Sequence, residues 1–136
     1  MLRFPLLAAA LLVLVLAACG GSSSKPYTAA ATKACLTKQG FTGVTTAAAK
    51  VGFIAAFAPN GGVQGRSPSG NVLTIAFADG PTSVPGIEKQ YRKAAPRSLR
   101  PHMGDIMESK GNAVLVWTVS PTQQELSDAE GCLASG

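Results

Sequence analysis

The sequence predicts one α+β domain, in which a small antiparallel sheet of about four strands carries three helices in the order α-β-β-α-β-β-α. Residues 71–78 and 112–119 have the apolar, β-branched composition that is typical of strands. Turn signals separate each of them from a preceding segment, so we expect two hairpins. Segments with helical end signals lie before, between and after these hairpins, and this arrangement favours an α+β layer sandwich.

Size and composition set the first limits on function. The chain of 136 residues is long enough for one domain but not for two. Charged residues make up 14% and hydrophobic residues 46%, which is the opposite of the balance that keeps a chain disordered. Aromatic residues make up only 6%, which argues against base stacking on single-stranded nucleic acid, and no nucleic-acid partner is expected.

The first half of the predicted domain contains a helix and a hairpin. Residues 28–39 are rich in Ala and Lys and are followed by Gly40 as a stop signal, so they predict a helix. Residues 51–58 alternate and predict a strand, although their alanine content leaves a helix open. Residues 59–70 are rich in Gly, Pro, Ser and Asn, and we expect them to form a long, mobile connector to the strand at 71–78. The residues expected on the inward side of the helix are Ala31, Ala34, Cys35 and Leu36.

The second half repeats this rhythm without repeating the residues. Residues 85–95 predict a helix in which Ile87, Tyr91 and Ala94 share one side, and residues 96–104 are expected to be irregular. Residues 105–109 and 112–119 predict a second hairpin across Lys110-Gly111, with a short helix at 105–110 as the alternative. Both sides of 112–119 are apolar, so this strand is expected inside the sheet.

The last predicted helix begins after residue 120. Ser120 is expected as its N-cap, Pro121 as its first residue and Gln123 as the partner in a capping box. The predicted inner side of this helix carries Leu126, Ala129 and Leu133, with Cys132 beside them.

The first 25 residues carry the most specific motif. Arg3 precedes an uncharged apolar run from Leu6 to Leu16, which is built like a signal peptide and is too short for a comfortable membrane span. The sequence Leu16-Ala17-Ala18-Cys19 resembles the lipobox of bacterial lipoproteins. This resemblance implies cleavage before Cys19, a diacylglycerol on its sulfur and an extracytoplasmic location on the cell membrane. Ordinary secretory cleavage is the alternative.

The lipobox resemblance divides the chain into three parts. Residues 1–18 are the expected signal peptide, 19–27 the lipidated cysteine with a Gly/Ser-rich flexible tether, and 28–136 the folded domain. The chain's general composition also resembles small Ala/Gly-rich lipoproteins of high-GC bacteria. That second resemblance implies no activity.

The other two cysteines predict a disulfide. With Cys19 lipidated, Cys35 and Cys132 form an even remainder outside the cytoplasm, where disulfides persist. Two buried free thiols are the alternative. A metal site is less favoured, because the chain has no C-x-x-C and contains one histidine.

Few residues are candidates for catalysis or metal binding. His102 and Asp105 are three residues apart, but Pro and Gly flank this segment, so an exposed loop histidine is the favoured interpretation. His102, Met103 and Met107 are weak candidates for copper ligands, and packing of the methionines in the core is the simpler interpretation. We therefore predict no catalytic residue, metal or cofactor.

A cluster of basic residues is the main candidate for binding. Five cations lie within twelve residues, against a single acidic residue, and could attract anionic lipid or cell-wall polymer. A solvated helix surface is the alternative. The sequence thus predicts an envelope binding module, with a small enzyme or a copper or small-ligand carrier as alternatives. The cluster consists of Lys89, Arg92, Lys93, Arg97 and Arg100.

Overall fold

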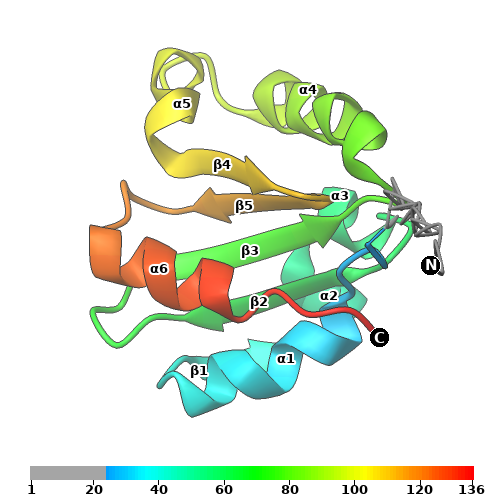
Figure 1. Ribbon diagram of the computed structural model, residues 1–136. Helices are drawn as coiled ribbons and strands as arrows, with labels where there is room; N and C mark the ends of the chain where they lie inside the picture. The colour runs from blue at the N-terminus through cyan, green and yellow to red at the C-terminus, as the bar shows by residue number, and fades with distance from the viewer. Residues whose placement is uncertain (1–23) are drawn as a thin grey trace, which may run out of the picture.

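Five antiparallel strands form one open sheet in the order β1-β2-β3-β5-β4 (Figure 1). The computed structural model describes residues 24–136. The α+β class is confirmed, but the sheet has five strands rather than about four. The additional edge strand β1 is four residues long and carries no strong apolar alternation. The strands are β1 (Thr42–Thr45), β2 (Gly62–Arg66), β3 (Val72–Phe77), β4 (Met107–Lys110) and β5 (Ala113–Trp117).

Helices cover both faces of this sheet. Figure 1 shows α6 in front of β3, and α2 and α3 behind the sheet. The front face also carries α1, and the back face also carries α4 and α5. The helices are α1 (Ala29–Lys38), α2 (Ala48–Val51), α3 (Phe53–Ala56), α4 (Val84–Ala94), α5 (Met103–Ile106) and α6 (Gln123–Gly131), with short 3-10 turns η1 (Pro81–Ser83) and η2 (Arg100–His102).

The core is a sandwich built from alternating strand residues. Leu73, Ile75 and Phe77 of β3 are fully buried, and Ile75 pairs in register with Leu115 of β5. Trp117, which is 1% exposed, packs against the Phe41 ring on the front face at a centroid distance of 6.4 Å. As predicted, 112–119 supplies a strand inside the sheet, because β5 pairs with both β3 and β4.

The predicted strand at 51–58 is wrong. Its residues form α2 and α3, two single-turn helices separated by Gly52, whose φ of 84° lies in the region that favours glycine. A strand would have placed the two phenylalanines on the side of Ala55. Instead Val51 and Ala55 are buried at a helical spacing, while Phe53 and Phe57 are each 76% exposed. The alanine content was the better guide to this segment.

The predicted connector at 59–70 is also wrong, because it contains β2. The true hairpin joins β2 to β3 through a tight turn at 67–71, where Ser67 N donates to the Asn71 carbonyl. The glycines of β2 serve close packing rather than flexibility. A Cβ on Gly62 would lie 2.5 Å from the Cβ of Ala55, and one on Gly65 would lie 3.2 Å from Val44.

Other predicted elements hold with changes at their ends. The helices at 28–39 and 85–95 are confirmed as α1 and α4, although Ala34 is exposed rather than inward. Segment 105–110, predicted as a strand or as a short helix, contains the end of one and the whole of the other, since α5 ends at Ile106 and β4 begins at Met107. The segment at 96–104 contains η2 and the start of α5.

The last helix begins later than predicted. Its N-cap is Thr122 rather than Ser120, and Thr122 forms a capping box with Glu125. The carboxylate at the third helical position satisfies the N-cap amide, which Gln123 at the first helical position does not do. Ala129 and Cys132 are buried, whereas Leu126 and Leu133 are only half-buried.

The predicted disulfide is confirmed. Cys35 of α1 is bonded to Cys132 at the end of α6, with a Cα–Cα distance of 5.2 Å. The bond joins the two helices of the front face across a sequence separation of 97 residues.

Candidate ligand-binding cleft

An apolar cleft of about 530 Å³ lies on the back face of the sheet. Its walls come from α2 and α3 on one side and from α4 and the α4–α5 segment on the other, with β5 at the base. The lining residues are Val51, Gly52, Phe53, Ile54, Tyr91, Ala94, Ala95, Leu99, Met103, Ile106, Val116, Trp117 and Thr118. This volume falls in the range of about 300–1,000 Å³ that is usual for small-molecule sites.

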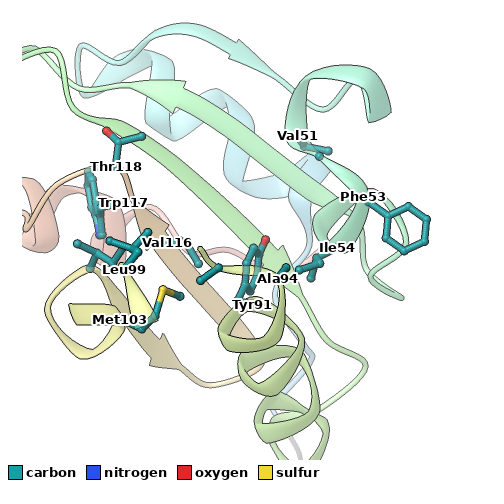
Figure 2. A pocket seen from close by; sticks show the side chains of 13 residues that line it. Val51, Phe53, Ile54, Tyr91, Ala94, Leu99, Met103, Val116, Trp117 and Thr118 are labelled. Atoms are coloured by element: carbon teal, nitrogen blue, oxygen red, sulfur yellow. The ribbon is translucent and has the colours of Figure 1, made fainter. Parts of the chain in front are cut away.

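Small and short elements leave this space unfilled. The helices α2 and α3 are single turns broken by Gly52, so they cover only part of the back face. At its carboxyl end α4 presents Ala94 and Ala95, whose side chains are too small to reach across to the opposite wall. Figure 2 shows Leu99 and Met103 on one side of the cleft and Ile54 and Val51 on the other.

Tyr91 supplies the central polar group of the cleft. Its side chain projects from α4 between the two walls (Figure 2). The hydroxyl oxygen is buried and has no hydrogen-bond partner among the described residues. Burial raises the pKa of Tyr91 to about 12, so the phenol stays protonated and is available as a donor. A buried hydroxyl without a partner is costly, and a ligand acceptor in the cleft would relieve that cost.

The rim of the cleft carries an exposed aromatic pair. Phe53 lines the cleft at its outer edge, and its ring points away from the interior (Figure 2). It packs on Phe57 one turn later, with ring centroids 4.7 Å apart. We call Phe53 and Phe57 the aromatic pair.

The predicted basic cluster lies on exposed surface, but its members differ. Arg92 pairs with Glu88 at 3.9 Å on α4. Arg100 donates from Nε to the Ala95 carbonyl and from Nη2 to the Lys93 carbonyl, so it helps to close the end of α4. Among the described residues, no carboxylate pairs with the remaining three cations. We call these three, Lys89, Lys93 and Arg97, the cationic strip.

The His102 region does not assemble a metal-binding group. His102 Nδ1 lies 3.7 Å from an Asp105 carboxylate oxygen, and both side chains are exposed. Met103 and Met107 are buried, whereas the imidazole is exposed. In residues 24–136 no group of three or more His, Cys, Asp or Glu side chains could hold a metal ion.

A polar cluster around Glu125 was missed from the sequence. This carboxylate is 8% exposed and accepts from Ser67 Oγ at 2.5 Å, from Ser69 Oγ and from the Thr122 amide. Burial acts to raise its pKa, but these hydrogen bonds outweigh burial and lower the pKa to about 2. A carboxylate held ionised in this way is a weak base, and it ties the β2–β3 turn to the start of α6.

The cleft itself was also missed, although two signals pointed to parts of it. Tyr91 and Ala94 were predicted on the inner side of a helix, but helical spacing does not distinguish a filled core from a cavity. The spacing of Phe53 and Phe57 fits one helical turn, and this would have revealed the aromatic pair had the segment been interpreted as a helix.

Several predictions concern residues outside those described. Cys19 and the segment before it are among them, so the lipobox remains a prediction. No helix within residues 24–136 is long and apolar enough to cross a membrane.

Comparisons with protein-family models, with curated proteins and with solved structures found no match to this chain.

Proposed function

We propose that this protein is a lipid-anchored, extracytoplasmic binding domain that takes an apolar ligand, such as an acyl chain, into the cleft between α3, α4 and α5. The observation that carries the proposal is a cavity of about 530 Å³ walled by aliphatic and aromatic side chains. Burial of apolar ligand surface there would favour binding by a free energy of about 25 cal/mol for each Å² removed from water. Of the alternatives raised by the sequence, a small-ligand carrier fits this cavity best.

The chemistry of the lining favours binding over catalysis. None of the residues that line the cleft in the described chain carries a carboxylate, an imidazole or a thiol. The Tyr91 hydroxyl is a neutral donor at physiological pH because its pKa is raised to about 12. The unpaired Tyr91 hydroxyl in an apolar cavity suits a ligand with a long apolar part and an acceptor atom, such as an ester or carboxyl oxygen.

The location part of the proposal rests on the amino-terminal motif. The lipobox resemblance at Leu16-Ala17-Ala18-Cys19 supports lipidation of Cys19, and the Gly/Ser sequence after it supports a short tether. The Cys35–Cys132 disulfide fits an oxidising compartment outside the cytoplasm. A domain held at a bilayer has continuous access to lipid-derived ligands.

The test is titration of the purified full chain with a naturally fluorescent polyunsaturated fatty acid. Ala94→Phe places a ring in the cleft from an exposed helix position and should weaken binding at least tenfold. Ala34→Phe is the matched control, because Ala34 is an exposed alanine of α1 on the opposite face, and it should bind like the parent. No saturable binding by the parent, or equal binding by all three chains, would refute the cleft as the site.

The cationic strip supports a second candidate function, binding of an anionic cell-wall polymer. Lys89, Lys93 and Arg97 are exposed and lack carboxylate partners among the described residues. Helix α4 starts beside the amino-terminal segment, since Asp79–Pro81 and Lys25–Tyr27 line a common depression. Lys93 and Arg97 are therefore at the far end from the tether, which favours a polymer over the anchoring bilayer.

A further inference from the structure

The aromatic pair is the outstanding apolar feature of the described surface. Phe53 and Phe57 are each 76% exposed, and Val119 is the other large hydrophobic residue exposed in residues 24–136. Scattered exposed apolar residues are ordinary, but two phenylalanine rings in contact on one turn form a contiguous patch. Nothing in the described chain covers them.

The amino-terminal segment is fixed to one end of the sheet. Tyr27 N donates to Asn112 Oδ1 at 2.7 Å, and Asn112 Nδ2 donates back to the Tyr27 carbonyl at 2.9 Å. Ser135 Oγ donates to the Lys25 carbonyl, which adds the carboxyl terminus to the same clamp. The chain therefore leaves the domain toward Cys19 from a defined place rather than from a loose end.

The aromatic pair lies at that same end. Asn60 follows Phe57 by three residues, and its carbonyl accepts from the Ala29 amide, two residues after Tyr27. Asn60 and Asn112 also both donate to the Ala78 carbonyl, so the segments that carry the pair and the clamp meet at the end of β3. Figure 1 shows α3 and the start of the described chain at the same end of the sheet.

The connection from this end to Cys19 is short. Tyr27 is eight positions after Cys19, which gives about 28 Å at full extension and about 16 Å for a flexible chain. A domain of this size has a radius of gyration of about 13 Å. A tether of that length keeps its own end of the domain near the bilayer, at a high effective concentration.

We propose that the aromatic pair inserts into the interfacial region of the bilayer that carries the Cys19 lipid, as a second membrane contact. This inference rests on the lipid anchor of the proposed function. Phenylalanine side chains on a polar domain bury favourably at the headgroup boundary, and Lys50, which is exposed and precedes Phe53 by three residues, suits anionic headgroups. Because Phe53 also forms the rim of the cleft, this membrane contact would place the entrance of the cleft next to the acyl chains.

The test uses the full lipidated chain in vesicles of phosphatidylcholine and phosphatidylglycerol, with and without bromine on the acyl chains. Trp117, the single tryptophan of the parent, is 1% exposed and gives a constant background. Phe57→Trp places a reporter in the pair without touching the cleft lining. Gln123→Trp places one at an exposed position at the start of α6, at the other end of the sheet.

The expected result is that brominated lipid at least halves the reporter emission of Phe57→Trp, with a blue shift in vesicles, and leaves Gln123→Trp unchanged. Equal quenching of both reporters, or of neither, overturns the insertion of the aromatic pair. Mass spectrometry of Cys19 reports the anchor separately. If the chain is lipidated but its Phe57→Trp reporter is not quenched, insertion is refuted and the lipid anchor stands. If Cys19 carries no lipid, both the anchor and this inference are refuted.

A melting curve and the mass of the disulfide-bonded form check that each variant is folded. Phe53→Trp in a chain that keeps Phe57 provides a second reporter, should Trp at position 57 disturb α3. Its Phe53→Trp emission must respond to brominated lipid in the same way, and failure to do so counts against insertion.

Discussion

The two faces of the sheet are built in different ways. The front face is covered by α1 and α6, helices of ten and nine residues, which are joined by the Cys35–Cys132 bond. The back face is covered in part by α2, α3 and α5, each of four residues, and by the longer α4. Long helices with a cross-link give a closed layer, whereas single turns leave a cleft of about 530 Å³.

The difference suggests a division of labour within one small domain. The front face holds the disulfide and the Glu125 cluster, both of which link parts distant in sequence. The back face gives up some packing and leaves a cavity, which the proposed ligand would fill in place of the protein's own side chains. Changes on the front face should therefore act on stability, and changes on the back face chiefly on binding.

Removal of the disulfide should have the largest effect. Cys35→Ser together with Cys132→Ser frees a loop of nearly 100 residues in the unfolded chain and should lower the free energy of unfolding by about 4–5 kcal/mol. Chemical denaturation with and without reductant measures it. A loss below about 1 kcal/mol would show that the front face does not depend on its cross-link.

Glu125→Gln should have the next largest effect, because it weakens several hydrogen bonds at a buried site. We expect a loss of about 1–3 kcal/mol at neutral pH. The pKa of Glu125 is lowered from 4.5 to about 2, so its stabilisation is present above pH 4.5 and is lost as the pH falls toward 2. The difference between parent and variant should shrink over this window.

Denaturation curves at several pH values measure this difference. The control is Glu88→Gln, which removes a more exposed carboxylate on the back face and should change stability by no more than about 0.5 kcal/mol. A parent–variant difference that stays constant between pH 5 and 2 would contradict the assigned role of Glu125.

The sequence was informative where local signals and packing agree. The segment 71–78 and the helix at 85–95 carry regular apolar spacing, and both were placed within about one residue of their true bounds. The pairing of Cys35 with Cys132 followed from counting cysteines in the oxidising compartment that the lipobox resemblance implies. These features depend on short stretches of sequence or on simple arithmetic.

The back face was harder to predict because its structure depends on contacts between distant segments. Gly62 is needed since Ala55 approaches its backbone, and nothing within five residues of Gly62 reveals this. The same glycines suggested a flexible connector and concealed β2. A cavity is an absence of side chains among several elements, so residue pattern alone could not indicate the cleft.

Gly62→Ala should test how tightly α3 sits on the sheet. Its methyl group would lie 2.5 Å from the Cβ of Ala55 and 2.8 Å from the Ala55 carbonyl oxygen, so α3 must shift. We expect a loss of about 1–3 kcal/mol in unfolding free energy and weaker fatty-acid binding. Gly86→Ala on α4 is the control, because no atom lies within 4 Å of its added Cβ and a helical alanine should stabilise slightly. If Gly62→Ala binds the fatty acid as the parent does, the position of α3 does not determine binding in the cleft.

The smallest effect on stability is expected at the cationic strip. Replacement of Lys89, Lys93 and Arg97 by Gln changes only exposed side chains of the back-face surface, so the unfolding free energy should change by no more than about 0.5 kcal/mol. If the strip binds an anionic polymer, retention on immobilised dextran sulfate should fall at least threefold at low salt. Retention of the parent should decline steeply with salt, since exposed charges are screened over about 8–10 Å at physiological ionic strength.

The matched control replaces Lys33, Lys38 and Lys50, which lie outside the strip and are also exposed. Equal losses in the two triple variants would mean that net charge, rather than the strip, governs retention, and binding by the back face would then rest on the cleft.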